Sequence, residues 1–349
     1  MRIFCGESRD QDSVNACGSV HAASETISTM SSLNGHAGAR HRRSVMPHVE
    51  QARPRHTAHA YDHVGHEYGC YANGEAGTYR FAHGDMILWE VIRAAIDELR
   101  CTGVSCVRVL DAGGGPGTWV RRIAAFANRL GLGIDAVGFD ISEKQLEIAR
   151  SHPESPKEYD PDARWKLEFL YHDLTEPLPW ATHQFHLVLC NYVVLNHLPK
   201  TALSRAIEQL CRVGAYRVIA SVRSVGSPPT GCIIGTEKLR EYHQDCSRGE
   251  LALELGDGSK HLLTFNFYSA ETLRALFALH GIVLDLRAID IFHSRFAPDM
   301  NWTGQLVNGL PGRTKMMTKL KEIEDSLCRQ PGWIDHGTHV LIVSQPTAG

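Results

Sequence analysis

The sequence lacks the features that mark membrane-spanning and disulfide-built proteins. It has no run of about 18 apolar residues, so no segment is predicted to span a bilayer. Its ten cysteines form no CxxC pair, and no disulfide framework is expected in a chain of 349 residues without an export signal. The N-terminal stretch MRIFCGESRDQD carries charge where a signal peptide would be apolar. We therefore expect a cytoplasmic protein.

An excess of basic residues is also missing. The chain has 36 Lys and Arg against 39 Asp and Glu, which gives a formal net charge of -3. Because nucleic-acid binding usually relies on a basic face, no nucleic-acid partner is expected. Without a long apolar run, membrane insertion is not expected either. The apolar fraction of 43% is enough for one large core or two modest ones. The composition makes no prediction about the oligomeric state.

Three regions differ in composition and periodicity. Residues 1–55 are rich in Ser, Ala, Gly, His and Arg without sustained periodicity, which predicts a disordered tail. Residues 56–105 are expected to form an N-terminal helical lid or cap, because FAHGDMILWEVIRAAIDELR has a helical apolar stripe. Residues 106–349 alternate between strand-like and helix-like stretches, which predicts a parallel sheet covered by helices.

The expected strands lie at 106–111, 134–140, 166–171, 185–191, 216–222 and 282–292, with a last one in HVLIVSQ. Expected helices lie at 118–130, 200–213 and 314–328, in SAETLRALFALHG, and after Ser142, which with Gln145 matches a capping box. Residues 223–265 interrupt this rhythm and contain Pro228 and Pro229. We interpret them as a substrate-selecting insertion over the carboxyl edge of the sheet, with a short helix in EKLREYHQDC, residues 237–246.

The most informative segment is VRVLDAGGGPGTW, residues 107–119. Gly113, Gly115 and Gly117 alternate between an apolar strand and the start of a helix, where a backbone without Cβ atoms can turn sharply and approach a ligand. The helix N-terminus adds free N–H groups. The spacing is GxGxG, with Thr118 where a dinucleotide fingerprint has its third glycine.

Acidic residues end the first three predicted strands or follow them. Asp111 suits a ligand with a cationic amino-acid group better than one with a pyrophosphate, which it would repel. Asp140 is placed to accept hydrogen bonds from a ribose diol, and Asp173 to reach an adenine amine, with Leu174 as an apolar wall. Each acid alone has an alternative, which is to cap the next helix or to face water. Together they describe an amino-acid tail, a ribose and an adenine.

LDAGGGPG, VGFDIS, FLYHDL and FHLVLCNYVVLNHL resemble the successive motifs of the class I S-adenosylmethionine-dependent methyltransferases, especially the group acting on small molecules such as quinones, sterols and natural products. The resemblance spans roughly residues 84–345. It implies a Rossmann-like seven-stranded mixed α/β sheet in the order 3-2-1-4-5-7-6, its last strand antiparallel and helices on both faces. It also implies S-adenosyl-L-methionine as the cofactor, bound over strands 1 and 2.

The resemblance carries a set of cofactor residues with it. The glycines would approach the methionine part, the second and third acids the ribose and adenine, and the end of the fourth strand the sulfonium: Asp111, Gly113, Gly115, Gly117, Asp140, Ile141, Asp173, Leu174, Asn191 and Tyr192. The fourth motif departs from the group by having His186 where Asp is usual. It also lacks the Asn-Pro-Pro-Tyr signature, which argues against methylation of DNA bases or protein amides.

His197, in the loop after the fourth strand, is the best-placed candidate for a general base, because its ordinary pKa suits proton removal near neutrality. The alternative is that it packs at the start of the next helix. Tyr242 and His243 in the insertion are weaker candidates. We expect no metal, although four histidines share one helical face beside Asp62: His56, His59, His63 and His66. The segment with Tyr61, Tyr68 and Tyr71 is expected to fold over the cofactor, with Arg80 near its carboxylate.

The sequence therefore predicts an enzyme that transfers a methyl group by in-line displacement to an O, N or C nucleophile of a small-molecule acceptor. Two alternatives stay open. One is an NAD(P)-dependent oxidoreductase, since Asp140 lies about where a ribose-binding acid would. The other is a non-catalytic, cofactor-binding partner subunit.

Overall fold

The computed structural model describes residues 56–62, 82–151, 165–228, 239–292 and 313–347, all within the compact unit Met46–Gly349. The expected tail at 1–55 and the predicted lid residues Tyr68, Tyr71 and Arg80 lie outside this part of the chain, as do His63 and His66.

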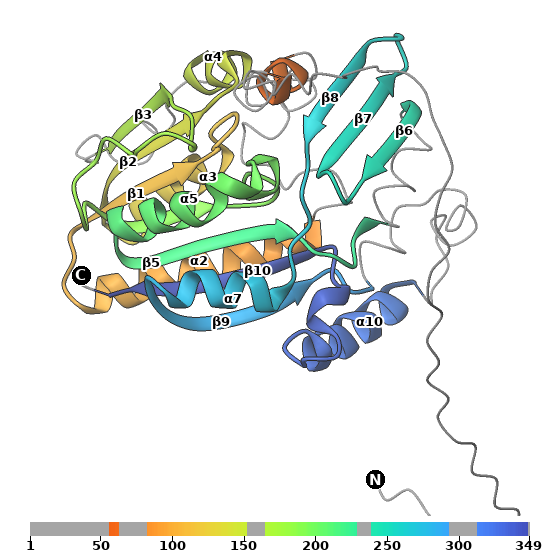
Figure 1. Cartoon of the computed structure of the whole chain (residues 1–349). Helices are drawn as coiled ribbons and strands as arrows, with labels where there is room; N and C mark the ends of the chain where they lie inside the picture. The colour runs from red at the N-terminus through yellow and green to blue at the C-terminus, as the bar shows by residue number, and fades with distance from the viewer. Residues whose placement is uncertain (1–55, 63–81, 152–164, 229–238, 293–312, 348–349) are drawn as a thin grey trace, which may run out of the picture. The chain divides into compact units, whose positions relative to one another are not determined.

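A seven-stranded sheet forms the centre of the fold (Figure 1). Its order is β3(Trp165–Tyr171), β2(Gly133–Asp140), β1(Cys106–Ala112), β4(Phe185–Cys190), β5(Gly214–Arg223), β10(His339–Pro346) and β9(Gly281–Ile289). β10 runs antiparallel to both of its neighbours, whereas β1 to β5 pair in parallel. Numbered along the chain, these strands have the order 3-2-1-4-5-7-6, so the predicted fold class is confirmed.

Helices bury both faces of the sheet. On one face, α2(Ala82–Cys101) and α3(Thr118–Arg129) pack with inward residues of the strands, such as Val107 and Val109. On the other, α5(Lys200–Val213) and α7(Ala270–Ala278) pack with Leu110 and Val188. Because neighbouring residues of a strand point to opposite faces, a strand covered on both sides must be apolar at nearly every position, as in LVLC, residues 187–190.

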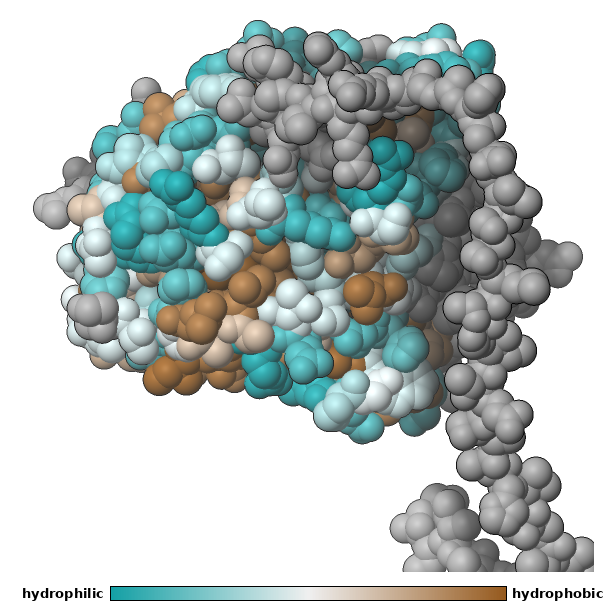
Figure 2. Space-filling model, viewed as in Figure 1, coloured by the Kyte–Doolittle hydropathy of each residue, from teal (hydrophilic) through white to brown (hydrophobic). Residues whose placement is uncertain are grey.

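The remaining described elements complete the frame around the sheet. They are a helical turn at 56–62, α4(Glu143–Ser151), α10(Arg313–Leu327) and the short helices η2(Leu195–His197) and η3(Ile334–His336). On the face seen in Figure 2, hydrophobic residues gather over α7 and β9, at the edge of the sheet, where Leu279, Ile282 and Leu284 are exposed.

The predicted short helix at 237–246 is wrong. Of this segment, residues 239–245 form β6(Leu239–Asp245), which pairs antiparallel with β7(Glu250–Leu255). β7 pairs with β8(Lys260–Thr264) in a separate three-stranded sheet, and residues 237 and 238 lie outside the described ranges. The helix-favouring composition of EKLREYHQ is overridden by pairing with an apolar partner strand. Local hydrogen bonds hold the turn between β6 and β7: Asp245 accepts from the Ser247 and Arg248 N–H groups, and Gly249 has φ +64°.

None of the described helices is both long and apolar enough to cross a bilayer. The cysteines within the described ranges are free thiols, and they are Cys101, Cys106, Cys190, Cys211, Cys246 and Cys328.

Candidate functional site

A cavity of about 470 Å³ lies at the carboxyl ends of the central parallel strands. The glycine turn after β1, the ends of β2, β3, β4 and β5, the helical turn at 56–62 and one face of the small sheet all contribute to its lining. Ten of the residues predicted from the sequence line it: Asp111, Gly113, Gly115, Asp140, Ile141, Asp173, Leu174, Asn191, Tyr192 and His197. This edge is where α/β sheets bind their ligands.

The glycine turn adopts a backbone that side chains would obstruct. Gly113, Gly115 and Gly117 have φ values of +68°, +52° and +81°. A Cβ on Gly113 would lie 2.9 Å from Cγ1 of Val194 and closer still to Cγ2. Gly117 is not among the lining residues. It is the N-cap of α3, and a Cβ there would lie 2.7 Å from Phe169, so its role is packing of the turn.

Two carboxyl groups sit beside this turn. Asp111 is 1% exposed, and its Oδ2 has no hydrogen-bond partner among the described residues. Burial, with a smaller contribution from the charge of Asp140, raises the pKa of Asp111 to about 8. Asp140 accepts hydrogen bonds from the N–H groups of Gly115 and Ser142, both at 2.9 Å. Burial raises the pKa of Asp140 against the effect of these bonds. Two such groups favour a cationic ligand.

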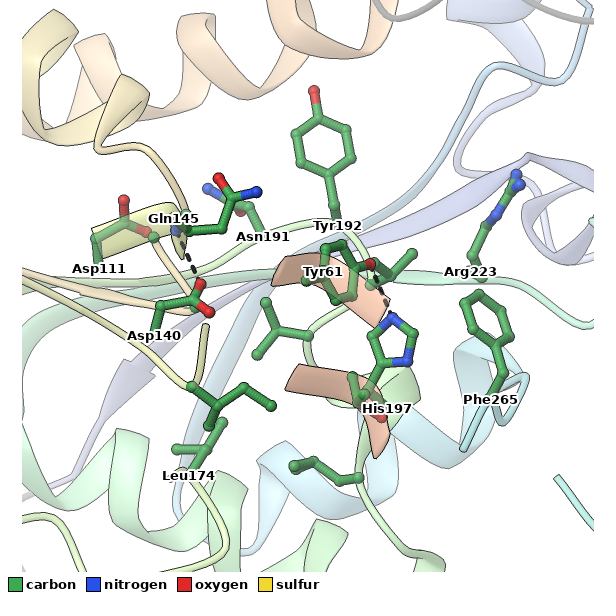
Figure 3. A pocket seen from close by; sticks show the side chains of 18 of the residues that line it. Tyr61, Asp111, Asp140, Gln145, Leu174, Asn191, Tyr192, His197, Arg223 and Phe265 are labelled. Carbon is green, nitrogen blue, oxygen red and sulfur yellow. Dashed lines mark hydrogen bonds between the residues drawn. The ribbon is translucent and has the colours of Figure 1, made fainter. Parts of the chain in front are cut away.

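Buried amides in the cavity lack partners within the described chain. Both polar atoms of Gln145 and of Asn191 are unpaired, although these residues are only 3% and 6% exposed. Figure 3 shows both amides close to Asp111 and Asp140. Buried polar groups are normally hydrogen-bonded, so this arrangement fits a polar ligand that supplies donors and acceptors.

Gln145 is a site residue that the sequence interpretation missed. The pattern Ser142-x-x-Gln145 was assigned to a capping box, and Ser142 Oγ does accept the Gln145 N–H at 3.2 Å. The second half of the box is absent, because the Gln145 side chain points into the cavity and makes no hydrogen bond in the described structure. The same spacing serves a cap and a lining residue, and only the side-chain direction separates the two.

Asp173 and Leu174 follow β3 and line the cavity. Oδ1 of Asp173 accepts hydrogen bonds from N and Oγ1 of Thr175, both at 2.8 Å. This oxygen is therefore held in a local turn, which is neither the helix cap nor the exposure to water that the sequence left as alternatives. Leu174 is 5% exposed and forms an apolar part of the wall. Tyr192 has φ +63°, a conformation rare for a bulky residue, and its N–H donates to Ser221 Oγ.

His197 is held through both ring nitrogens. Nδ1 lies 2.8 Å from the carbonyl oxygen of Thr264 and Nε2 lies 3.0 Å from Tyr61 Oη. Since a carbonyl only accepts, the proton is assigned to Nδ1, and Nε2 accepts from the tyrosine. Burial lowers the pKa of His197 to about 4. The imidazole is thus neutral at pH 7 and weakly basic, which favours positioning of Tyr61 over proton removal.

The helical turn at 56–62 contacts the site directly. Thr57 and Tyr61 line the cavity, and Asp62 accepts hydrogen bonds from Ser142 Oγ at 2.6 Å and from the Lys144 N–H at 3.2 Å. These contacts join the turn to the start of α4, where Ser142 lies two residues after Asp140 in the chain. The chain before the sheet therefore contributes to the cavity wall.

The other histidine and tyrosine candidates differ in whether they line the cavity. On β6, Tyr242 lines the cavity and His243 does not, as expected from the alternation of a strand. His59 lies with its ring 5.7 Å from that of His261. Within the described ranges, the one group with a geometry able to hold a metal ion is His83, Asp290 and Glu324, where His83 Nε2 and Glu324 Oε1 form a buried pair at 3.3 Å.

The raised pKa of Asp111 predicts a pH dependence of stability. Its carboxyl group is protonated more readily in the folded chain, with a pKa of about 8, than in the unfolded chain, with a pKa near 3.8. The contribution of the neutral acid is complete below pH 3.8 and is lost as the pH rises through 8. We expect the stability of the native protein relative to Asp111→Asn to fall by at least about 1 kcal/mol between pH 5 and pH 8.5. Urea denaturation of both proteins measures it, and a pH-independent difference would contradict it.

Comparison with known proteins adds a family match to this geometry. Residues 109–215, from β1 to the start of β5, match the model of a methyltransferase domain family. A search of curated proteins found no match. The [4+2]-cyclase SpnF is a similar solved structure, with 16% sequence identity, a TM-score of 0.46, and coverage of 84% of this chain and 96% of that chain. An S-adenosylmethionine-dependent methyltransferase from Clostridium acetobutylicum has 11% identity and a TM-score of 0.45, with 83% of this chain and 100% of that chain covered. One from Methanosarcina mazei has 16% identity and a TM-score of 0.43, with 70% of this chain and 94% of that chain covered.

The matched segment contains the glycine turn, Asp140, Asp173 and the end of β4, which are the parts that carried the resemblance in the sequence. The strand order, with β10 antiparallel between β5 and β9, is the one that the resemblance implied. Residues 109–215 therefore match a methyltransferase domain model, within a sheet whose strand order is the one expected from the sequence.

Proposed function

We propose that this protein binds S-adenosyl-L-methionine in the cavity and transfers its methyl group to a small-molecule acceptor. The observation that carries the proposal is the arrangement of Asp140 at the end of β2, bonded to the N–H of Gly115 in a left-handed glycine turn. This places a carboxylate and a side-chain-free backbone at one point of the carboxyl edge. A nucleoside joined to a charged amino acid matches both.

Different lining residues bind different parts of the cofactor in this proposal. Asp140 is placed to accept hydrogen bonds from the ribose hydroxyls, and Leu174 with Ile141 to cover the adenine. Asp111 complements the ammonium group, and the unpaired amides of Gln145 and Asn191 supply further hydrogen bonds. When bound, the cofactor supplies a methyl group on a positively charged sulfur. The role of the protein is then to align a nucleophile with that carbon, which contributes on the order of 7–11 kcal/mol.

Tyr61 and His197 bear on the acceptor side of the reaction. Tyr61 Oη donates to His197 Nε2, and a hydroxyl oxygen is also a hydrogen-bond acceptor for an acceptor O–H or N–H. Because His197 is a weak base whose Nε2 already accepts from Tyr61, this pair orients the acceptor rather than ionising it. The turn at 56–62, which carries Tyr61, also shields the site from water, as a reactive sulfonium requires.

The experiment is a calorimetric titration with S-adenosylhomocysteine, and in parallel with NADH. We expect binding of the first and none of the second. Asp140→Ala should weaken S-adenosylhomocysteine binding by about tenfold or more while the fold is retained, because charge-assisted hydrogen bonds to the ribose are lost.

The matched control is Asp135→Ala, on the same strand. Asp135 lies outside the cavity and pairs with Lys166 at 3.8 Å, so this variant should bind like the native protein. Unchanged affinity in Asp140→Ala would refute the placement of the ribose. Binding of NADH would favour the oxidoreductase alternative, and cofactor binding without turnover on any acceptor would favour the partner subunit.

A further inference from the structure

Charged side chains lie at separate places in the cavity, whose lining also includes the carboxyl groups of Asp85 and Asp173. Asp111 and Asp140 lie at one end, together with the glycine turn, and Figure 3 shows Arg223 on the opposite side of Tyr192 and His197. Among the described residues that line the cavity, Arg223 is the one Lys or Arg side chain. The acidic end suits a cationic group, so the Arg223 end suits a second, negatively charged molecule.

Arg223 is held in place by its backbone. It is the last residue of β5, its N–H donates to Asn196 Oδ1 at 2.9 Å, and its carbonyl oxygen accepts from Asn196 Nδ2 at 3.2 Å. It lies directly opposite His339 in the antiparallel pair, so the two side chains share one face of the sheet. Burial and the charge of Arg223 both lower the pKa of His339, which leaves that imidazole neutral and Arg223 as the cation.

A buried hydroxyl group accompanies Arg223. Ser227 lies in the turn that follows β5, where its N–H donates to the carbonyl oxygen of Ser224 at 3.0 Å. Ser227 is 1% exposed and lines the cavity, and its Oγ has no hydrogen-bond partner within the described ranges. A guanidinium group and an unpaired hydroxyl group that line one cavity, from residues four positions apart in the chain, are donors that a carboxylate or a similar oxyanion accepts from.

Between the two ends, the wall is apolar. The small sheet and the segment that follows β8 form this wall. The residues that line the cavity there are Leu239, Tyr242, Leu251, Leu253, Phe265 and Phe267. Leu251 and Leu253 share a face because they are two residues apart on β7. Leu251 and Phe265 are buried together with Ala60 of the helical turn at 56–62. This wall favours a hydrocarbon or aromatic body.

We infer that the acceptor is an amphipathic anion, with an apolar body against the small sheet and a carboxylate or similar oxyanion at Arg223 and Ser227. The inference rests on the proposed function, because the acidic end is assigned to the cofactor. It places the nucleophile of the acceptor between its two ends, beside Tyr61.

Two dyes that differ by one sulfonate test the anion site on the full chain. 8-Anilinonaphthalene-1-sulfonate and N-phenyl-1-naphthylamine share their ring system, and both report binding by fluorescence. In the presence of S-adenosylhomocysteine, we expect the native protein to bind the sulfonate dye about tenfold more tightly than the neutral dye. Equal affinities, or no binding of the sulfonate dye, would overturn the inference whether or not any variant folds.

Arg223→Gln should weaken binding of the sulfonate dye about tenfold and leave the neutral dye and S-adenosylhomocysteine within about twofold. Arg217→Gln is the matched control on the same strand, where Arg217 pairs with Glu98 outside the cavity, and it should change none of the three. Leu253→Asp should weaken both dyes, because it puts a charge on the apolar wall.

The titration with S-adenosylhomocysteine separates the two proposals. If Arg223→Gln loses affinity for S-adenosylhomocysteine, Arg223 belongs to the cofactor site, and the acceptor inference falls while the proposed function stands. If the native protein binds the sulfonate dye through Arg223 but never binds S-adenosylhomocysteine, the anion site stands and the proposed function falls.

Discussion

Gly113→Ala will reduce the affinity for S-adenosylhomocysteine by about 100-fold. Alanine at φ +68° is strained by roughly 1–2 kcal/mol. Its Cβ would also lie 2.9 Å from Cγ1 of Val194, so the turn and the loop after β4 must move apart. Both effects displace the backbone that we propose contacts the methionine part of the ligand. Isothermal titration calorimetry measures the loss.

Gly103→Ala is the control for backbone strain away from the cavity. Gly103 has φ +86°, and a Cβ there meets nothing within 4 Å, so this variant carries the backbone strain alone, far from the ligand. It should lower stability slightly and leave ligand affinity unchanged. The double variant Gly113→Ala with Val194→Ala removes the contact but not the strain, and it should recover part of the lost affinity. Native-like affinity in Gly113→Ala would contradict the assignment of the turn.

Asn196→Ala will lower the free energy of unfolding by about 3 kcal/mol. Asn196 is fully buried, and its amide bonds the N–H and carbonyl groups of Arg223 and donates to the carbonyl oxygen of Asn266 at 2.6 Å. Alanine leaves these buried backbone groups without partners, each at a cost of about 1–3 kcal/mol. Urea denaturation measures the change.

Asn128→Ala provides the control, since Asn128 is a partly exposed residue of α3 and its loss should matter by less than about 0.5 kcal/mol. In Asn196→Ala the end of β5 is also released, so the affinity for the sulfonate dye should fall while that for S-adenosylhomocysteine is kept. A loss of stability below about 1 kcal/mol would mean that the hydrogen bonds from Asn196 of η2 to the backbone of Arg223 and Asn266 do not stabilise the fold.

The sheet was predictable because its signals are local. The strands that are buried on both faces are continuous apolar runs, and each helix repeats its apolar residues at helical spacing. The glycine turn was predictable for the same reason, since positive φ values at Gly113, Gly115 and Gly117 follow from residues adjacent in the chain. Asp111 and Asp140 could be placed beside it because parallel strands end at one edge.

The small sheet was not predictable in this way. β6 has the composition of a helix, and its conformation depends on pairing with β7 and on burial against the turn at 56–62. Likewise, the Ser142-x-x-Gln145 spacing could not reveal that the Gln145 amide points into the cavity while the Gln145 N–H completes a helix cap. Periodicity reports which face is apolar, and it does not report which neighbour covers that face.

The sequence by itself determined the class of fold, the glycine turn and the acids around it, because each depends on residues close together in the chain or on strand ends that any parallel sheet aligns. Only the tertiary structure decided the opposite end of the cavity. Tyr61, Asn196 and the segment 223–227 are far apart in the sequence, and their meeting depends on long-range packing that leaves no periodic trace. The low pKa of His197 has the same origin, because burial by distant residues, and not its neighbours in the chain, removes its basicity.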